Sequence, residues 1–158
     1  MSDPVVVGVI ADTHGLLRPE AIEALEGCDL IVHAGDVGDE AILDELDEIA
    51  PVTAVRGNMD RGELGRRLPL TEVVSAGDAT LYLIHIVEEL DLDPVAAGFD
   101  AVIYGHTHEP ALDRRDGVLW LNPGSAGPRR FDLPVTLARV TVAGGELEVE
   151  HVRLTGAR

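Results

Sequence analysis

Seven residues with metal-binding side chains each follow the end of a short apolar segment. Asp12 and His14 follow Val5–Ile10, and Asp36 follows Leu30–Val32. The other four are Asn58, His85, His106 and His108, which follow residues 52–55, 80–84 and 101–104. Carboxylate, imidazole and amide groups together suit divalent transition metals. The recurrence of such groups after five segments predicts a metal site.

The apolar segments read as strands of a parallel sheet in the first half of the chain. Val5–Ile10 has no polar alternation, which is typical of a buried strand. Apolar residues at helical spacing predict helices over Pro19–Leu25 and Glu40–Ile49. The alternation of strands and helices predicts parallel strands, whose carboxyl ends share one edge of a sheet. We therefore expect the seven side chains to converge there.

The second half of the chain is richer in predicted strands. They cover Val73–Val74, Thr80–Ile84, Ala101–Tyr104, Val118–Leu121, Val135–Val142 and Leu147–Leu154. Residues 75–79 and Gly144-Gly145 read as hairpin connections, and a short helix is expected over Leu90–Gly98. The expected fold is α/β, with two sheets face to face and helices outside, in a single domain spanning residues 1–158.

The number of candidate ligands exceeds what one ion normally takes from a protein. Four imidazoles, two carboxylates and one amide suit two ions if one carboxylate bridges them. Gly35, Gly57 and Gly105 each precede a ligand, where a missing Cβ lets the backbone turn sharply. Two ions about 3.5–4 Å apart convert a shared water to hydroxide near neutral pH and clamp phosphoryl oxygens. This combination favours phosphate-ester chemistry.

Composition excludes several other function classes. The chain has 29 acidic and 12 basic residues, a formal charge of −17, and no lysine, so a Walker A loop and a Schiff-base site are ruled out. Its single cysteine, Cys28, rules out an internal disulfide or a zinc finger. The negative charge and an aromatic content of 3% argue against a stable nucleic-acid complex or membrane binding. The start of the chain lacks a basic targeting region, so a cytoplasmic location is expected.

The ordered motifs resemble those of a known enzyme family. Asp12-Thr13-His14, Gly35-Asp36, Gly57-Asn58, His85 and Gly105-His106-Thr107-His108 are similar to the motifs of the calcineurin-like metallophosphoesterases. Asn122-Pro123-Gly124-Ser125 is similar to a motif of the small single-domain phosphodiesterases of the YfcE type. The resemblance runs from about Val5 to Arg129. Each motif is weak alone, but the set in this order is specific.

The resemblance implies a fold, a cofactor and roles for the seven residues. The fold would be a four-layer α/β/β/α sandwich of two mixed sheets. Asp12, His14 and His108 would hold one ion, Asn58, His85 and His106 the other, and Asp36 would bridge them. The cofactor would be two divalent ions, with Mn²⁺ favoured and Fe, Ni or Zn as alternatives. Asp36, Asn58 and His106 would be the residues closest to catalysis.

The expected activity is hydrolysis of a small phosphate ester, more a diester than a monoester, by in-line attack of a hydroxide shared by the ions. Alternatives are a phosphomonoesterase and a non-catalytic protein-binding scaffold of the same fold. A homo-oligomer is compatible with the sequence. Larger family members often have a histidine general acid after the asparagine ligand, but this chain has Met59, which cannot donate a proton.

Several residues allow a structural role instead of, or in addition to, a role in the metal site. Asp12 and Asp36 taken singly could be helix caps, and Asn58 a turn residue, but the joint pattern favours metal ligation. His33 is expected to form a hydrogen bond in the core. His151 is expected on the surface. Arg129 is the favoured candidate for a phosphate contact.

Overall fold

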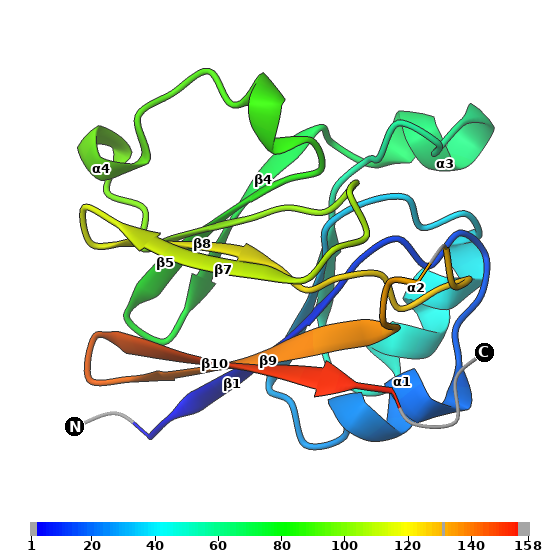
Figure 1. The fold of residues 1–158 in the computed structure, drawn as a ribbon, viewed down its shortest axis with the longest axis horizontal. Helices are drawn as coiled ribbons and strands as arrows, with labels where there is room; N and C mark the ends of the chain where they lie inside the picture. Colours follow the sequence, from blue (N-terminus) through cyan, green and yellow to red (C-terminus); the bar gives the residue numbers. More distant parts are fainter. Residues whose placement is uncertain (1–2, 131, 155–158) are drawn as a thin grey trace.

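Two five-stranded sheets lie face to face in the computed structural model, which describes residues 3–130 and 132–154 (Figure 1). The first sheet has the order β10-β9-β1-β2-β3. Its strands are β1 (Val5–Ile10), β2 (Leu30–His33), β3 (Val52–Ala54), β9 (Thr136–Ala143) and β10 (Glu146–Arg153). β1 pairs parallel with β2 and antiparallel with β9, so the sheet is mixed as expected.

The second sheet is also mixed and has the order β4-β5-β6-β8-β7. Its strands are β4 (Thr71–Ala76), β5 (Ala79–Ile84), β6 (Ala101–Ile103), β7 (Ala111–Arg115) and β8 (Val118–Asn122). β5, β6 and β8 are parallel neighbours, and the antiparallel strands β4 and β7 form the two edges. The sheets bury a shared apolar layer that includes Val7, Val9, Leu81, Leu83 and Leu121.

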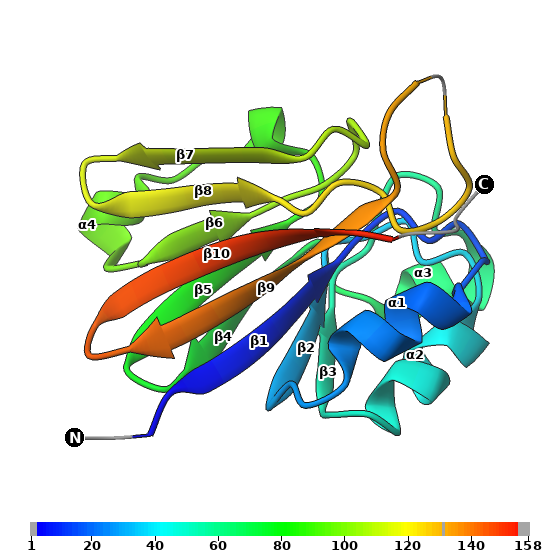
Figure 2. The same ribbon diagram turned by 60° about the horizontal axis from the view of Figure 1, so that its bottom comes forward.

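Two helices cover the outer face of the first sheet (Figure 2). They are α1 (Pro19–Leu25) and α2 (Glu40–Asp47). Pro19 suits the first turn of α1, and the side chain of Asp39 caps α2 by accepting from the Ala41 N–H at 3.0 Å. Gly8 in β1 leaves space for Leu25, because a Cβ there would meet the leucine side chain. The helix α1 thus packs close to the central strand β1.

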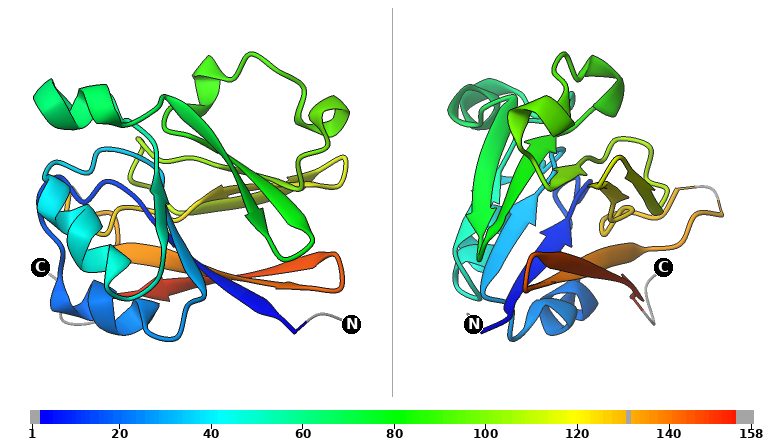
Figure 3. Two further views of the ribbon diagram at one scale, coloured as in Figure 1. Left: turned by 180° about the vertical axis from the view of Figure 1, so that it is seen from behind. Right: turned by 90° about the vertical axis from the view of Figure 1, so that its left-hand side faces the viewer.

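The outer layer over the second sheet is much thinner (Figure 3). It consists of a 3₁₀ turn, η1 (Val87–Glu89), and a one-turn helix, α4 (Pro94–Ala97). The helix expected over Leu90–Gly98 is therefore shorter than predicted. Asp93 caps the Val95 N–H at 3.0 Å, Pro94 begins the turn, and Gly98 ends it with φ of 80°.

Several boundaries differ from those expected from the sequence. The helix α3 (Gly62–Arg67) and the edge strand β7 were not predicted, because glycine and charged residues hide both patterns. α2 ends at Asp47 rather than at residue 49, where the chain turns toward Pro51. The hairpin connection expected over residues 75–79 is limited to Gly77 and Asp78.

The topology brings five strand ends to one side of the molecule. The parallel strands β1, β2 and β3 end there in the first sheet, and β5 and β6 end there in the second. Each is followed by a loop that carries one or two of the seven candidate ligands. Within residues 3–130 and 132–154, no helix is long and apolar enough to cross a membrane.

Candidate metal centre

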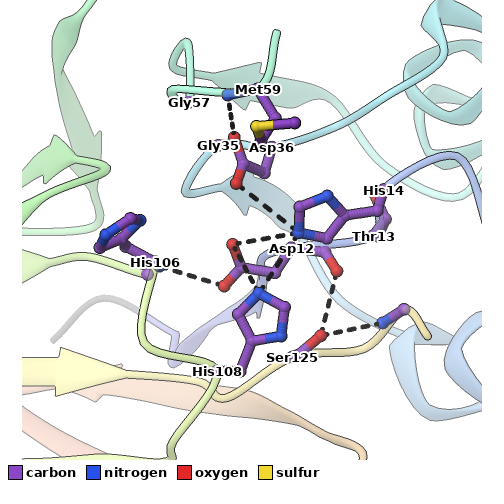
Figure 4. A network of polar contacts seen from close by, with 12 residues as sticks. Asp12, Thr13, His14, Gly35, Asp36, Gly57, Met59, His106, His108 and Ser125 are labelled. Carbon is purple, nitrogen blue, oxygen red and sulfur yellow. Dashed lines mark hydrogen bonds and ion pairs between the residues drawn. The ribbon is translucent and has the colours of Figure 1, made fainter. Parts of the chain in front are cut away.

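Three of the predicted ligands form one compact group. Ligand atoms of Asp12, His14 and His108 all lie within 4.8 Å of one another. The Nε2 atoms of His14 and His108 are 3.9 and 3.7 Å from Oδ1 of Asp12 and 3.3 Å from each other (Figure 4). Residues from the loops after β1 and β6 therefore face one point.

A second group forms beside the first. Asp36, His85 and His106 also place ligand atoms within 4.8 Å of one another. Oδ1 of Asn58 lies 3.0 Å from Nε2 of His85 and 3.1 Å from Nδ1 of His106. All seven residues expected to converge are thus found together, from the ends of five strands.

Asp36, a member of the second group, also faces the first. Its Oδ2 atom is 3.6 Å from Nε2 of His14 and 3.2 Å from Nε2 of His85. Its Oδ1 atom accepts a hydrogen bond of 2.8 Å from the Met59 N–H, which orients the carboxylate. One oxygen therefore faces a histidine of each group, the position that a bridging ligand needs.

These donors fit divalent ions. Oδ1 of Asp12 is fully buried and has no hydrogen-bond partner among the described residues, although three histidine Nε2 atoms lie within 4 Å. Bonds of about 2.1 Å to one ion place neighbouring ligand atoms about 3–3.5 Å apart, close to the separations found here. A buried carboxylate oxygen among imidazole nitrogens is costly unless a cation or proton is shared between them.

The backbone is strained at the same positions. Among the described residues, six non-glycine residues have positive φ, and five are the candidate ligands Asp12, His14, Asp36, His106 and His108. Their φ values lie between 47° and 78°. Such conformations cost free energy and cluster at functional sites. The strained positions are therefore mainly those of the candidate metal ligands.

Burial controls the charge of the first group. It raises the pKa of Asp12 to about 7 and lowers the pKa of His108 to about 4. Burial also lowers the pKa of His14. Both histidines are therefore neutral at pH 7, and their lone pairs are available to a metal without competition from protons.

Asp36 and His85 stabilise each other's charged forms in the second group. Burial opposes ionisation of Asp36, but hydrogen bonds from His85 and from the Met59 N–H outweigh it and lower the pKa of the carboxyl. Burial likewise opposes protonation of His85, but the contact with Asp36 outweighs it and raises the pKa of the imidazole. The contact between the two side chains therefore outweighs the effect of burial on both pKa values.

One hydrogen bond orients the ring of His85. Its Nδ1 lies 2.7 Å from the carbonyl oxygen of Ala34, which can only accept, so Nδ1 carries the proton. Nε2 is then left facing Asp36 and Asn58. This is the arrangement by which a backbone carbonyl fixes the tautomer of a metal-binding histidine.

His33 joins two of the ligand loops from inside the core, as expected. It is completely buried, and burial lowers its pKa to about 4. The Gly35 N–H donates to Nδ1 at 3.1 Å, so Nε2 carries the proton and donates to Oγ1 of Thr13 at 3.0 Å. Thr13 in turn donates to the carbonyl of Val37 at 2.8 Å. These bonds connect the loops that carry Asp12 and Asp36.

Asp60 connects the next pair of loops, a role that the sequence analysis did not assign. Its buried carboxylate accepts from the N–H groups of Val37, Gly38 and Gly57 at 3.2, 3.0 and 2.9 Å. The loop carrying Asp36 is thereby fixed to the loop carrying Asn58. Its position in the sequence could have indicated this role. Asp60 is a polar residue two positions after the candidate ligand Asn58, and Thr13, which also links two ligand loops, lies directly between the candidate ligands Asp12 and His14.

Asn122 and Ser125 support the remaining loops. Nδ2 of Asn122 donates to Oγ1 of Thr107 at 3.0 Å and to the carbonyl of Gly105 at 3.3 Å. Oγ of Ser125 donates to the carbonyl of Asp12 at 3.0 Å. The motif at residues 122–125 therefore stabilises the ligand loops after β1 and β6 through hydrogen bonds.

The structure adds detail on two residues outside the ligand set. His151 is not a free surface residue but is half-buried, and its Nε2 donates to the carbonyl of Asn122 at 2.9 Å. Arg130 lies close enough to lower the pKa of Asp12, His14 and His108. The phosphate contact expected of its neighbour Arg129 stays a prediction.

Comparison with known proteins identifies the family. The model of the calcineurin-like phosphoesterase superfamily domain matches residues 5–145. The chain belongs to the calcineurin-like phosphoesterase superfamily. It is 37% identical to a probable metallophosphoesterase of Methanothermobacter thermautotrophicus, covering 96% of this chain and 94% of that protein. It is also 30% identical to a phosphodiesterase of Methanocaldococcus jannaschii, covering 75% of this chain and 82% of that one.

A solved structure shares the fold of this chain. The structure of vacuolar protein sorting 29 from Cryptosporidium parvum is similar with a TM-score of 0.77 and 20% identity, covering 96% of this chain and 98% of that one. This likeness concerns the fold alone. The predicted architecture of two mixed sheets is therefore confirmed for this calcineurin-like protein.

Proposed function

We propose that the protein is a phosphodiesterase that depends on two divalent ions. The position of Asp36 carries this proposal, because its Oδ2 faces His14 of one ligand group and His85 of the other. Mn²⁺ is the proposed metal, with Fe, Ni and Zn as alternatives that accept the same nitrogen and oxygen ligands. When bound, two such ions lower the pKa of water and offset charge on phosphoryl oxygens.

The residues divide between holding the ions and meeting the ester. Asp12, His108 and Asp36 are buried, and with His14 they would form the closed side of the centre. Asn58 and His106 are exposed and would form the open side, where the phosphate group arrives. His106 also orders the backbone, because its N–H donates to Oδ2 of Asp12 at 3.2 Å.

The proposed substrate is a small phosphate diester. A monoester carries more negative charge and meets stronger repulsion from a chain of formal charge −17. The same charge argues against stable complexes with nucleic acid or anionic membranes. We further propose a cytoplasmic location, and a homo-oligomer is compatible with these features.

A protein-binding scaffold is the second candidate, suggested by the fold shared with vacuolar protein sorting 29. A scaffold does not require ligand side chains to converge. Here all seven candidate positions hold residues able to bind a metal, and five of them have a strained backbone. This favours the enzyme.

The His106→Ala protein tests the proposal. Hydrolysis of bis-p-nitrophenyl phosphate with added Mn²⁺ should fall by about 100-fold or more, because an exposed group beside the ester is removed. p-Nitrophenyl phosphate tests the monoester alternative under the same conditions. Full activity in the variant would contradict the role of His106. Wild-type protein that takes up no transition metal on dialysis and cleaves neither ester would support the scaffold.

A further inference from the structure

A cavity of about 620 Å³ opens beside the second ligand group. It shares Asn58 and His85 with the candidate metal centre. From there it extends along the loop before α3, the start of β4, the end of β5 and the segment through η1. A volume of this size is typical of small-ligand sites. A phosphate ester held at the ions therefore has space beside it for the alcohol that it carries.

Part of the lining is apolar. Leu70, Ile84 and Ile86 contribute to it, and the side chain of Leu70 is 59% exposed. The ring of Tyr82 is stacked on Phe99 with centroids 4.9 Å apart, so its place in the wall is fixed by packing. Binding of a ligand with an apolar body would remove this apolar surface from water, which favours binding.

The charged part of the lining is mostly acidic. It contains Asp60, Glu89, Asp91 and one cation, Arg56. The carboxylate of Asp60 already accepts three backbone N–H groups, and Nη1 of Arg56 donates to the carbonyl of Gly65 at 3.1 Å. Glu89 and Asp91 are exposed carboxylates facing the remaining space. A second anionic group would be repelled there.

We infer that this cavity binds the alcohol group of the substrate and selects one that is uncharged or cationic over one that bears a second negative charge. The inference rests on the proposed phosphodiesterase function, since the metal centre must hold the phosphate end. It assigns the apolar wall at Leu70 to the body of the alcohol. It assigns Glu89 and Asp91 to the discrimination between charges.

Three esters of methylphosphonic acid provide the test, because each has one negative charge at phosphorus and a single alcohol. The 2-aminoethyl, propyl and 2-carboxyethyl esters differ in the charge of that alcohol. Their dissociation constants are measured by calorimetry with Mn²⁺-loaded protein. The carboxyethyl ester should bind about fivefold more weakly than the other two, and the difference should shrink at about 0.5 M NaCl because exposed charges are screened.

Two double variants separate local from general charge effects. Glu89→Gln with Asp91→Asn should bring the three constants to within about twofold of one another. The matched control is Asp78→Asn with Glu146→Gln, which removes the same amount of charge. Asp78 lies between β4 and β5 and Glu146 begins β10, so both lie at the end of the sheets away from the ligand loops. This control should keep the wild-type order. Leu70→Ala should weaken the propyl ester about threefold, because apolar contact is lost.

The outcomes distinguish the two proposals. Equal binding of all three esters by the wild-type protein would overturn the selection by charge and leave the phosphodiesterase proposal intact. If both double variants reduce the difference between the esters equally, the net charge of the protein causes that difference, and the proposed role of the cavity is wrong. If none of the three binds protein that holds two ions, the phosphodiesterase proposal fails and the inference fails with it.

Discussion

The Nε2 atoms of His14 and His108 lie 3.3 Å apart, although 94 positions separate the two residues in the chain. Burial lowers the pKa of both imidazoles, that of His108 to about 4, so both rings are neutral at pH 7. Two neutral rings can share one proton between these nitrogens at most. A cation between them would use both lone pairs.

His108→Ala should therefore lose one ion and retain the other. Elemental analysis should give about one metal per chain rather than two, because the Asn58, His85 and His106 side of the centre keeps its ligands. Activity on bis-p-nitrophenyl phosphate should fall by at least about 100-fold. His151→Ala is the control, since His151 lies on β10 and contacts Asn122 instead. Two ions in His108→Ala would contradict the assignment.

Asp12→Asn should stabilise the metal-free protein at neutral and higher pH. Burial raises the pKa of Asp12 to about 7 from 3.8, so the folded state holds a proton that the unfolded state has lost. Wild-type stability therefore falls as pH rises from about 4 to about 7 and levels off above it. Asparagine does not titrate, and its amide can donate to a neighbouring imidazole.

The measurement is urea unfolding in the presence of a chelator at several pH values. The gain of Asp12→Asn over the wild type should grow between pH 4 and 7 and reach about 2–4 kcal/mol at pH 8, since one pKa unit corresponds to about 1.4 kcal/mol. With Mn²⁺ present, the order should reverse because the variant loses a ligand. A gain that does not change with pH would contradict the pKa assigned to Asp12.

The convergence of the ligands could be predicted because it depends on strand direction alone. Val5–Ile10 is apolar throughout, so its identity as a central strand was clear, and Asp12 follows it by chain connectivity. The two-sheet architecture followed from the same pattern and from the family resemblance. The boundaries of β1, α1 and β5 were correct or within one residue.

The missed features depend on tertiary contacts. β7 has four exposed residues out of five and becomes a strand only by pairing with β8. Asp60 lies beside a predicted ligand, but its three hydrogen bonds depend on the loop at Val37 being held nearby. His151 looks like a surface residue in a strand of alternating charge, and its contact with Asn122 arises from folding of distant segments.

Gly57→Ala should disrupt the bridging position. A Cβ at Gly57 would meet the backbone nitrogen and the carboxylate of Asp36, so the carboxylate must move. Gly105→Ala is the matched comparison, because its Cβ would meet Ala11 and Asp12 at 3.1 Å, which is tight but can be accommodated by a small shift. Metal analysis and activity should therefore fall much further in Gly57→Ala. A larger loss in Gly105→Ala would contradict the central place of Asp36.

Met59→His should add a proton donor beside the leaving group. Met59 follows Asn58, its side chain is 49% exposed, and its N–H donates to Asp36 through the backbone, a contact that the substitution keeps. Methionine cannot protonate an alcohol as it departs, so the wild type should cleave esters of acidic phenols much faster than esters of alkyl alcohols. An imidazole near that point supplies the missing proton.

The measurement compares two diesters in the wild type and in two variants at Met59. In Met59→His, hydrolysis of methyl p-nitrophenyl phosphate should change by less than about threefold, whereas hydrolysis of a dialkyl phosphate should rise by about tenfold or more, because general acid catalysis matters most for poor leaving groups. Met59→Gln should raise neither rate, since an amide can donate a hydrogen bond but is too weak an acid to transfer a proton to the leaving alcohol. The gain in Met59→His should also decline as pH rises and the imidazole loses its proton. Equal changes for both esters would show that the side chain affects binding, and would remove leaving-group protonation as the explanation.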